Sequence, residues 1–182
     1  MAISLSLGLL ILRLGLGLTI AAHGAQKLFG WFGGSGPTRL KQGFEKQGLK
    51  PAWLWTSLVI LGEFGGGISL VLGFLTPLGA AGVFGAMLMA IFKSHWKNGF
   101  WNSKRGLEFP LALLTMGVAI GLTGPGSYSL DALFGFALPE PLLFLVLTAA
   151  AALVDVVGLL MTRPATVAPT EAKPTEAKSS AS

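Results

Sequence analysis

The sequence predicts an all-α protein built as a polytopic bundle of transmembrane helices. Its mean hydropathy is +0.70, and 52% of its residues are hydrophobic while only 12% are charged. That composition is far from the composition of an ordinary soluble domain. Five apolar runs occupy most of the chain, and the Lys and Arg residues are concentrated in alternate gaps between them. The runs are expected to be helical, because a helix satisfies its own backbone hydrogen bonds in lipid.

Five membrane spans are expected, at residues 3–22, 53–75, 78–92, 107–122 and 142–161. The first, second and fifth runs reach the roughly 20 residues that a helix needs to cross ~30 Å of hydrocarbon. The third and fourth runs are shorter, and we expect them to form a hairpin whose ends are buried against neighbouring helices. The alternative is that one of these two runs is re-entrant, which would place the carboxyl terminus on the opposite side of the membrane.

The cations predict how the spans are oriented. Apart from Arg13, every Lys and Arg lies in the gap after the first run, in the gap after the third run or beyond the fifth run. The segments that face the other way, around Thr76 and at residues 123–141, contain none. Because cationic loops near span ends remain on the cytoplasmic side, we expect a multi-pass protein of the cell (inner) membrane, with its amino terminus outside and its carboxyl terminus in the cytoplasm. The same bias favours five crossings.

The chain is expected to form one helical bundle over residues 1–162, followed by a tail. The first run is expected to be a retained span, because Arg13 lies inside it and no basic flank of a secretory signal precedes it. The tail at 163–182 repeats the sequence Pro-Thr-Glu-Ala-Lys and has no large apolar residue. It is therefore expected to be disordered and cytoplasmic.

Two connections between the spans carry structural information. After the first run, Leu40, Phe44 and Leu49 alternate with Lys, Arg and Gln, which predicts an amphipathic segment lying on the inner membrane surface. The gap at Thr76 and Pro77 is so short that the second and third spans must be adjacent and antiparallel, with the proline at the start of the third helix.

The composition excludes several functions. With no cysteine, the chain cannot supply disulfides, cysteine-ligated iron–sulfur clusters or a catalytic thiol. A net charge of +5 does not indicate nucleic-acid binding here, because the cations lie beside apolar spans and suit an anionic inner leaflet. The expected partners are the lipid bilayer and another protein, either in a membrane complex or as a homodimer, and no metal site is expected.

Two charged residues lie deep within the expected spans. Glu63 is ten residues into the second span, which is about 15 Å at ~1.5 Å per residue. A charged side chain at the centre of a bilayer costs roughly 2.5–3.5 kcal/mol on insertion scales. Arg13 lies at a similar count from the outer end of the first span, so we expect the two side chains to pair. Such a pair either fixes the register of two helices or forms part of a site.

Small residues recur on one face of the second span. They predict that its backbone approaches a neighbouring helix closely, and the first span carries a similar set. The residues of the second span are Gly62, Gly66, Ser69 and Gly73, and those of the first are Gly8, Gly15 and Thr19.

Two further acidic residues stand outside this pattern. Asp155 lies well inside the fifth run, near enough to the inner face for Arg163 or a basic loop to neutralise it. Asp131 follows the outer turn and is expected to cap a short helix.

A candidate site lies at the inner end of the first span. His23, Gln26 and Lys27 are spaced to project from one helical face. Aromatic residues follow at once, and polar donors beside flat apolar rings suit a quinone headgroup. Together with Glu63 and Arg13 these residues form a candidate quinone pocket, with Glu63 and His23 as candidates for proton transfer. An ordinary aromatic belt is the alternative, and two histidines from different helices could instead ligate haem.

Three separated motifs resemble the DoxX family of small membrane proteins. They are His23 to Gly34, the glycine-rich stretch from Gly62 to Thr76, and Gly124 to Asp131, so that the resemblance covers roughly residues 5 to 131. The family typically has four helices, and the fifth run and the tail depart from that pattern. The resemblance implies a quinone-linked or redox-linked membrane subunit, in which His23, Gln26, Lys27 and Glu63 are the matching positions of interest.

Three functions follow from these observations. The first is an integral membrane subunit of a quinone-linked or redox-linked oxidoreductase complex, which would need a partner to donate electrons and would not be a self-sufficient enzyme. The second is a small-solute or proton-coupled carrier in which Arg13 and Glu63 line a pathway. The third is a non-catalytic anchor whose basic inner loops recruit a soluble partner.

Overall fold

The computed structural model describes residues 3–136 and 138–162, and this part of the chain is helical with no strands, which confirms the predicted all-α class. The tail at 163–182 lies outside the described residues. The α-helices are α1 (Ile3–Leu28), α2 (Gly36–Lys46), α3 (Ala52–Ile60), α4 (Gly66–Leu72), α5 (Thr76–Ala90), α6 (Glu108–Thr123), α7 (Leu130–Leu133) and α8 (Glu140–Leu160).

Two of the long helices contain π-helical turns. The turn η2 (Leu61–Gly65) joins α3 and α4 into one continuous helix, Ala52–Leu72. In the same way α5 continues through η3 (Ile91–His95) and the short 3-10 segment η4 (Trp96–Asn98). Within the described residues, these two helices together with α1 and α8 are long and apolar enough to cross a membrane. The fourth predicted span, α6, is also an apolar helix but is shorter, at 16 residues.

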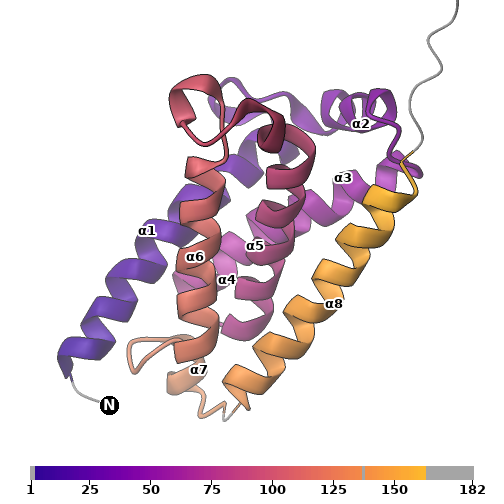
Figure 1. Ribbon diagram of the computed structural model, residues 1–182. Coiled ribbons are helices and arrows are strands. Elements are labelled where there is room, and N and C mark those ends of the chain that lie inside the picture. Colours follow the sequence, from indigo (N-terminus) through magenta and orange to yellow (C-terminus); the bar gives the residue numbers. More distant parts are fainter. Residues whose placement is uncertain (1–2, 137, 163–182) are drawn as a thin grey trace, which may run out of the picture.

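The helices run between two ends of the bundle (Figure 1). One end holds the start of α1, the turn between α4 and α5, and the loop that contains α7. The other end holds α2 and the loop between α5 and α6. All the described Lys and Arg residues except Arg13 belong to this second end: Lys27, Arg39, Lys41, Lys46, Lys50, Lys93, Lys97, Lys104 and Arg105. The structure therefore separates a cationic end from an end whose one described cation is the buried Arg13, as the charge pattern predicts.

The long helix Ala52–Leu72 lies between α1 and α5, and glycines allow the close approach on both sides. A Cβ atom on Gly24 would lie 2.4 Å from the backbone nitrogen of Phe64, and one on Gly62 would lie 2.6 Å from the carbonyl oxygen of Gly82. The predicted small-residue face of the second span is confirmed. The set predicted for the first span is wrong, because Gly8 and Gly15 have nothing within 4 Å.

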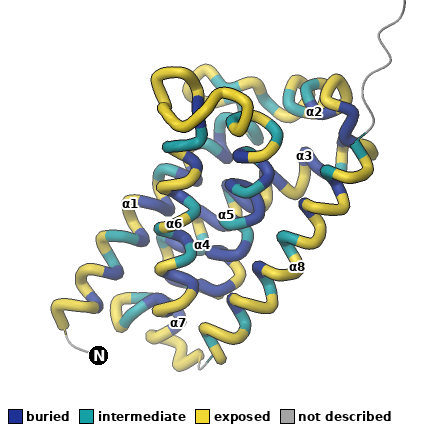
Figure 2. Tube along the Cα trace, in the orientation of Figure 1, coloured by how far each residue is buried: buried dark blue, intermediate teal, exposed yellow. Residues whose placement is uncertain are grey.

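The burial pattern suits a bundle in lipid. Figure 2 shows that the outward faces of α1 and α8 are exposed along most of their length. The exposed residues on these faces are large and apolar, such as Ile11, Leu18 and Leu153. The central core lies between the helices and includes Leu16, Ile20, Leu70, Val83, Leu113 and Phe144.

The segment α2 packs on the protein instead of presenting its apolar side to lipid. Phe44 is buried in a second core cluster with Trp55 and Met89, and Leu49, just beyond α2, is 1% exposed in the same cluster. Phe44 and Leu49 therefore face the protein and not the lipid, and the position of the segment at the inner membrane surface stays a prediction. The amphipathic pattern was identified correctly, but its apolar face covers the cationic end of the bundle.

Candidate functional site

The helix register places Arg13 and Glu63 at different levels. Gly24 of α1 lies against Phe64, whereas Arg13 lies against Gly73, ten residues beyond Glu63 on the long helix. Ten helical residues correspond to about 15 Å. The predicted pair between Arg13 and Glu63 is therefore wrong. Counting residues from the span ends gave similar depths, but α1 continues to Leu28, six residues beyond its predicted end.

Glu63 pairs instead with Lys27, near the end of α1. The Lys27 Nζ atom donates a hydrogen bond to Glu63 Oε1 and forms a salt bridge with it. The Glu63 side chain is 2% exposed and the Lys27 side chain is 27% exposed, so the carboxylate is deep and the ammonium is near the surface. Glu63 Oε2 is buried and has no hydrogen-bond partner among the described residues. The carboxylate thus keeps one oxygen available to a proton or a ligand.

The local backbone around Glu63 is also unusual. Glu63 is the middle residue of the π-helical turn η2, and Phe64 beside it is packed on Gly24. Such turns inside α-helices are rare and frequently occur at functional sites. The sequence predicts no such turn in the second span, and the glycines beside Glu63 are the local feature that accompanies it.

His23 and Gln26 lie on the same helix as Lys27 and are half-buried. The imidazole of His23 meets the ring of Phe109 edge-on, with the ring centroids 5.7 Å apart. Gln26 Nε2 donates to the carbonyl oxygen of Phe32 at 3.4 Å. These residues therefore share one end of α1, but the contact among the described candidate residues is the one between Lys27 and Glu63, because His23 packs on Phe109 of α6 and Gln26 bonds the turn at Phe32. Arg13 is at the other end.

Arg13 belongs to a separate buried cluster. Its side chain is fully buried, and Nη2 donates to the carbonyl oxygen of Tyr128 in the loop before α7. Asp131 in the same loop accepts hydrogen bonds from Leu75 N at 2.8 Å, from Thr76 N at 3.0 Å and from Thr76 Oγ1 at 2.8 Å. This cluster ties α1 and the loop to the start of α5.

Asp131 does not have the predicted role. It was expected to cap a short helix of its own, but the hydroxyl of Ser129 caps α7 by accepting from Ala132 N at 3.1 Å. Asp131 caps α5, more than fifty positions earlier in the sequence. The start of α5 at Thr76 with Pro77 in the first turn is as predicted.

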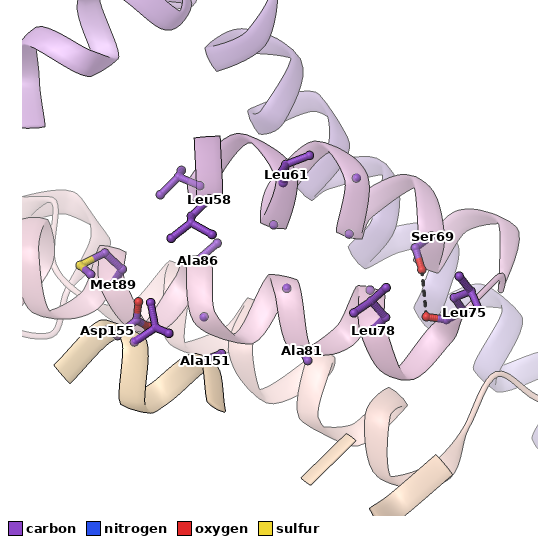
Figure 3. A pocket seen from close by; sticks show the side chains of 18 of the residues that line it. Leu58, Leu61, Ser69, Leu75, Leu78, Ala81, Ala86, Met89, Ala151 and Asp155 are labelled. Carbon is purple, nitrogen blue, oxygen red and sulfur yellow. Dashed lines mark hydrogen bonds between the residues drawn. The ribbon is translucent and has the colours of Figure 1, made fainter. Parts of the chain in front are cut away.

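A third feature is a cavity of about 560 Å³ between the long helix Ala52–Leu72, α5 and α8 (Figure 3). Its walls are mostly apolar, and Asp155 of α8 is the acidic residue that lines it. Glu63 does not line it, although Gly62 and Gly65 on either side do. Asp155 Oδ2 is buried without a hydrogen-bond partner in the described part of the chain. Arg163, the neutralising partner expected for Asp155, lies outside the described residues.

The apolar helices and the exposed apolar faces define a multi-pass α-helical membrane protein with charged groups buried between its helices. Comparison with known proteins then gives the family. A family model described as DoxX matches residues 8–96. The chain is also 33% identical over 128 residues to the "Inner membrane protein YqjF" of Escherichia coli (strain K12), over 69% of this chain and 91% of that protein.

The chain therefore belongs to the DoxX family. The matched region contains Arg13, His23, Gln26, Lys27 and Glu63, whereas α8 lies beyond it. No solved structure matches the chain.

Proposed function

We propose that this chain is the membrane subunit of a redox-linked complex and that it binds a quinone at the end of α1 that carries Lys27. The observation that supports this function best is the buried carboxylate of Glu63, which has one oxygen paired with Lys27 and the other without a partner in the described residues. A carboxylate at this depth is costly unless it is paired or neutral, so a buried oxygen without a partner in the described residues suits a site that takes up a proton or a ligand.

The residues at this end of α1 fit the needs of a quinone. A bound quinone accepts electrons and protons at its two carbonyl oxygens. Lys27 and Gln26 supply hydrogen-bond donors, and Glu63 can hold a proton on Oε2. Phe29 and Phe64, whose rings meet edge-on at 5.5 Å, supply apolar surface nearby. The electrons must come from a partner protein, because the chain has no cysteine to ligate an iron–sulfur cluster.

Binding of a short-chain benzoquinone to the purified full chain in lipid nanodiscs tests the proposal. We expect saturable quenching of tryptophan fluorescence, and an affinity about tenfold lower for Glu63→Gln, which is the effect of weakening one charge-assisted hydrogen bond. Glu45→Gln is the matched control, because Glu45 is exposed and paired only with Lys41 on α2. Equal affinity of wild type and Glu63→Gln for the quinone would contradict the proposed role of Glu63. Absence of saturable quinone binding would contradict the proposed function itself.

The small-solute or proton-coupled carrier function is not supported by the structure. It required Arg13 and Glu63 to line one pathway, and the register separates them. The anchor function keeps its basis in the cationic end of the bundle. It predicts that Glu63→Gln leaves complex formation unchanged while neutralisation of Arg39, Lys41 and Lys46 together abolishes capture of the partner.

We also propose that the cationic end faces the cytoplasm of an inner membrane, with the amino terminus outside. Support comes from the charge separation and from the name of the Escherichia coli relative. Because the chain has no cysteine, single cysteines report their side directly. A membrane-impermeant maleimide added to intact spheroplasts should label Leu133→Cys, and should label Ser103→Cys only after lysis. The reverse pattern would invert the topology.

A further inference from the structure

The cavity between the long helix, α5 and α8 has the form of a slot. Its lining follows α5 from Leu78 to Met89, twelve residues that rise about 16 Å along the helix. Figure 3 shows Asp155 and Met89 at one end of this slot and Ser69 and Leu75 at the other. Its volume is within the range of small-molecule sites in proteins. The slot is therefore long enough for an extended apolar chain.

The polar side chains Ser69 and Asp155 in the slot differ in whether they already have hydrogen-bond partners. The Ser69 hydroxyl is already used, because it donates to the carbonyl oxygen of Phe74 at 2.6 Å. Asp155 is 7% exposed, and its Oδ2 atom has no hydrogen-bond partner within residues 3–136 and 138–162. Gly85 keeps space beside that atom, since a Cβ on Gly85 would lie 3.9 Å from it. A buried acceptor without a donor is costly. The end of the slot that Asp155 lines is therefore suited to a ligand that carries a hydrogen-bond donor.

We propose that this slot binds one long-chain lipid alcohol, with its hydroxyl donating to Asp155 Oδ2 and its chain lying along α5. A single donor at one end of an extended apolar body matches a slot in which Asp155 Oδ2, at one end, is the side-chain acceptor without a partner in the described residues. A quinol fits less well, because it carries a second hydroxyl, and apart from Asp155, Ser69 and Trp55 the side chains that line the slot are apolar. The inference does not rest on the proposed function, since Glu63 and Lys27 do not line the slot.

Trp55 lines the slot and supplies a reporter. The test uses the full chain in phosphatidylcholine vesicles, with the other tryptophans, Trp31, Trp53, Trp96 and Trp101, replaced by phenylalanine. The probe is a dibrominated octadecanol, whose bromines quench nearby indole fluorescence. Its dibrominated methyl ether is the matched control, because it has the same chain but no hydroxyl donor.

We expect saturable quenching by the alcohol at a mole fraction about tenfold lower than that required by the ether, the effect of one hydrogen bond to a buried carboxyl. Asp155→Leu should abolish this preference. Gly65→Leu should weaken quenching by both probes, because Gly65 lines the slot and has open space where a Cβ would be. Gly43→Leu on α2 is the control for the glycine substitution, since Gly43 also has nothing within 4 Å but lies outside the slot.

Equal, non-saturating quenching by alcohol and ether would overturn the proposal, because it would mean that the probes are dissolved in bulk lipid. Preference for the alcohol retained in Asp155→Leu would overturn it as well. Displacement of the alcohol by a short-chain benzoquinol at lower mole fraction than by unlabelled octadecanol would reassign the slot to a quinol. Displacement by octadecanol alone, with the benzoquinone still binding in the assay for Glu63, supports two separate sites.

Discussion

Two clusters of buried charge lie at different levels of α1, and their carboxylates differ in how completely their oxygens are satisfied, although Arg13 Nε and Nη1, in the cluster with Asp131, also lack hydrogen-bond partners among the described residues. At the end of the bundle that holds Arg13, Asp131 accepts three hydrogen bonds that involve both of its oxygens. At the cationic end, Glu63 shares one oxygen with Lys27 and leaves the other without a partner in the described chain. The first carboxylate is fully used by the fold, whereas the second retains binding capacity.

This difference separates a structural role from a functional one. The Asp131 cluster joins three segments that are far apart in sequence, and its geometry leaves no acceptor for a ligand. The Lys27–Glu63 pair joins two helices at a π-helical turn and leaves Glu63 Oε2 buried without a hydrogen-bond partner in the described residues. Burial of a charge alone therefore does not identify a site. The number of satisfied lone pairs does so better.

The substitution expected to lower the free energy of unfolding most is at Asp131. Asp131→Asn replaces one acceptor oxygen by a donor that faces backbone N–H groups, and breaking a buried charged network of this kind costs about 3–5 kcal/mol. Unfolding in mixed micelles, followed by tryptophan fluorescence, measures this loss. Asp155→Asn is the matched control, because Oδ2 of Asp155 has no partner to lose in the described residues, and its change should stay within about 1 kcal/mol. Similar losses in the two variants would contradict a structural role specific to Asp131.

The next largest loss of stability is expected at the contact between Gly24 and Phe64, which fixes the register of α1 against the long helix. Gly24→Val would place a side chain 2.4 Å from the backbone nitrogen of Phe64, which cannot move without displacing the long helix. Overpacking against backbone should cost about 3 kcal/mol. Gly15→Val is the control, since Gly15 has nothing within 4 Å, and it should change the free energy of unfolding little. If Gly24→Val were as stable as Gly15→Val, the register that separates Arg13 from Glu63 would be wrong.

The sequence was sufficient to predict the five helices, the separation of cations and the turn at Thr76 and Pro77. Those features depend on local hydropathy and on charge near span ends. The partners of Arg13 and Glu63 depend on the register between helices, which glycines Gly17 and Gly24 set by allowing contact with the long helix at particular points. A sequence shows that a helix has small residues, but it does not show which of them meet a neighbour.

The slot beside Asp155 was missed for a related reason. Two of its walls, the long helix and α5, are consecutive in the sequence, but the third wall, α8, is separated from them by α6 and α7, so local patterns do not show that the three helices enclose a slot. The signal available in the sequence was the single carboxylate in the fifth run, far from any cation other than Arg163. The glycines of the second span were a further signal, because Gly62, Gly65 and Gly66 line the same slot.

A smaller effect is expected at the Lys27–Glu63 pair. Lys27→Met leaves the Glu63 carboxylate buried without its counter-ion, and we expect a loss of about 2 kcal/mol, below that of a fully buried pair because Lys27 is partly exposed. The double variant Lys27→Met, Glu63→Gln should recover part of that loss, because it removes the uncompensated charge. A double variant less stable than Lys27→Met would show that Glu63 is held by something other than Lys27.

The smallest effect is expected at the surface pair on α2. Lys41 Nζ and Glu45 Oε1 are 3.7 Å apart, and both side chains are about half exposed. Pairs of this kind contribute roughly 0.3–0.5 kcal/mol between positions four apart on a helix, so Lys41→Gln should change the free energy of unfolding by no more than that. The loss in free energy of unfolding for Lys41→Gln is most informative beside the loss for Lys27→Met, because both variants remove one lysine from one ion pair and the two pairs differ in burial. A loss at Lys41 equal to that at Lys27 would mean that net charge, and not burial of the partner carboxylate, governs both.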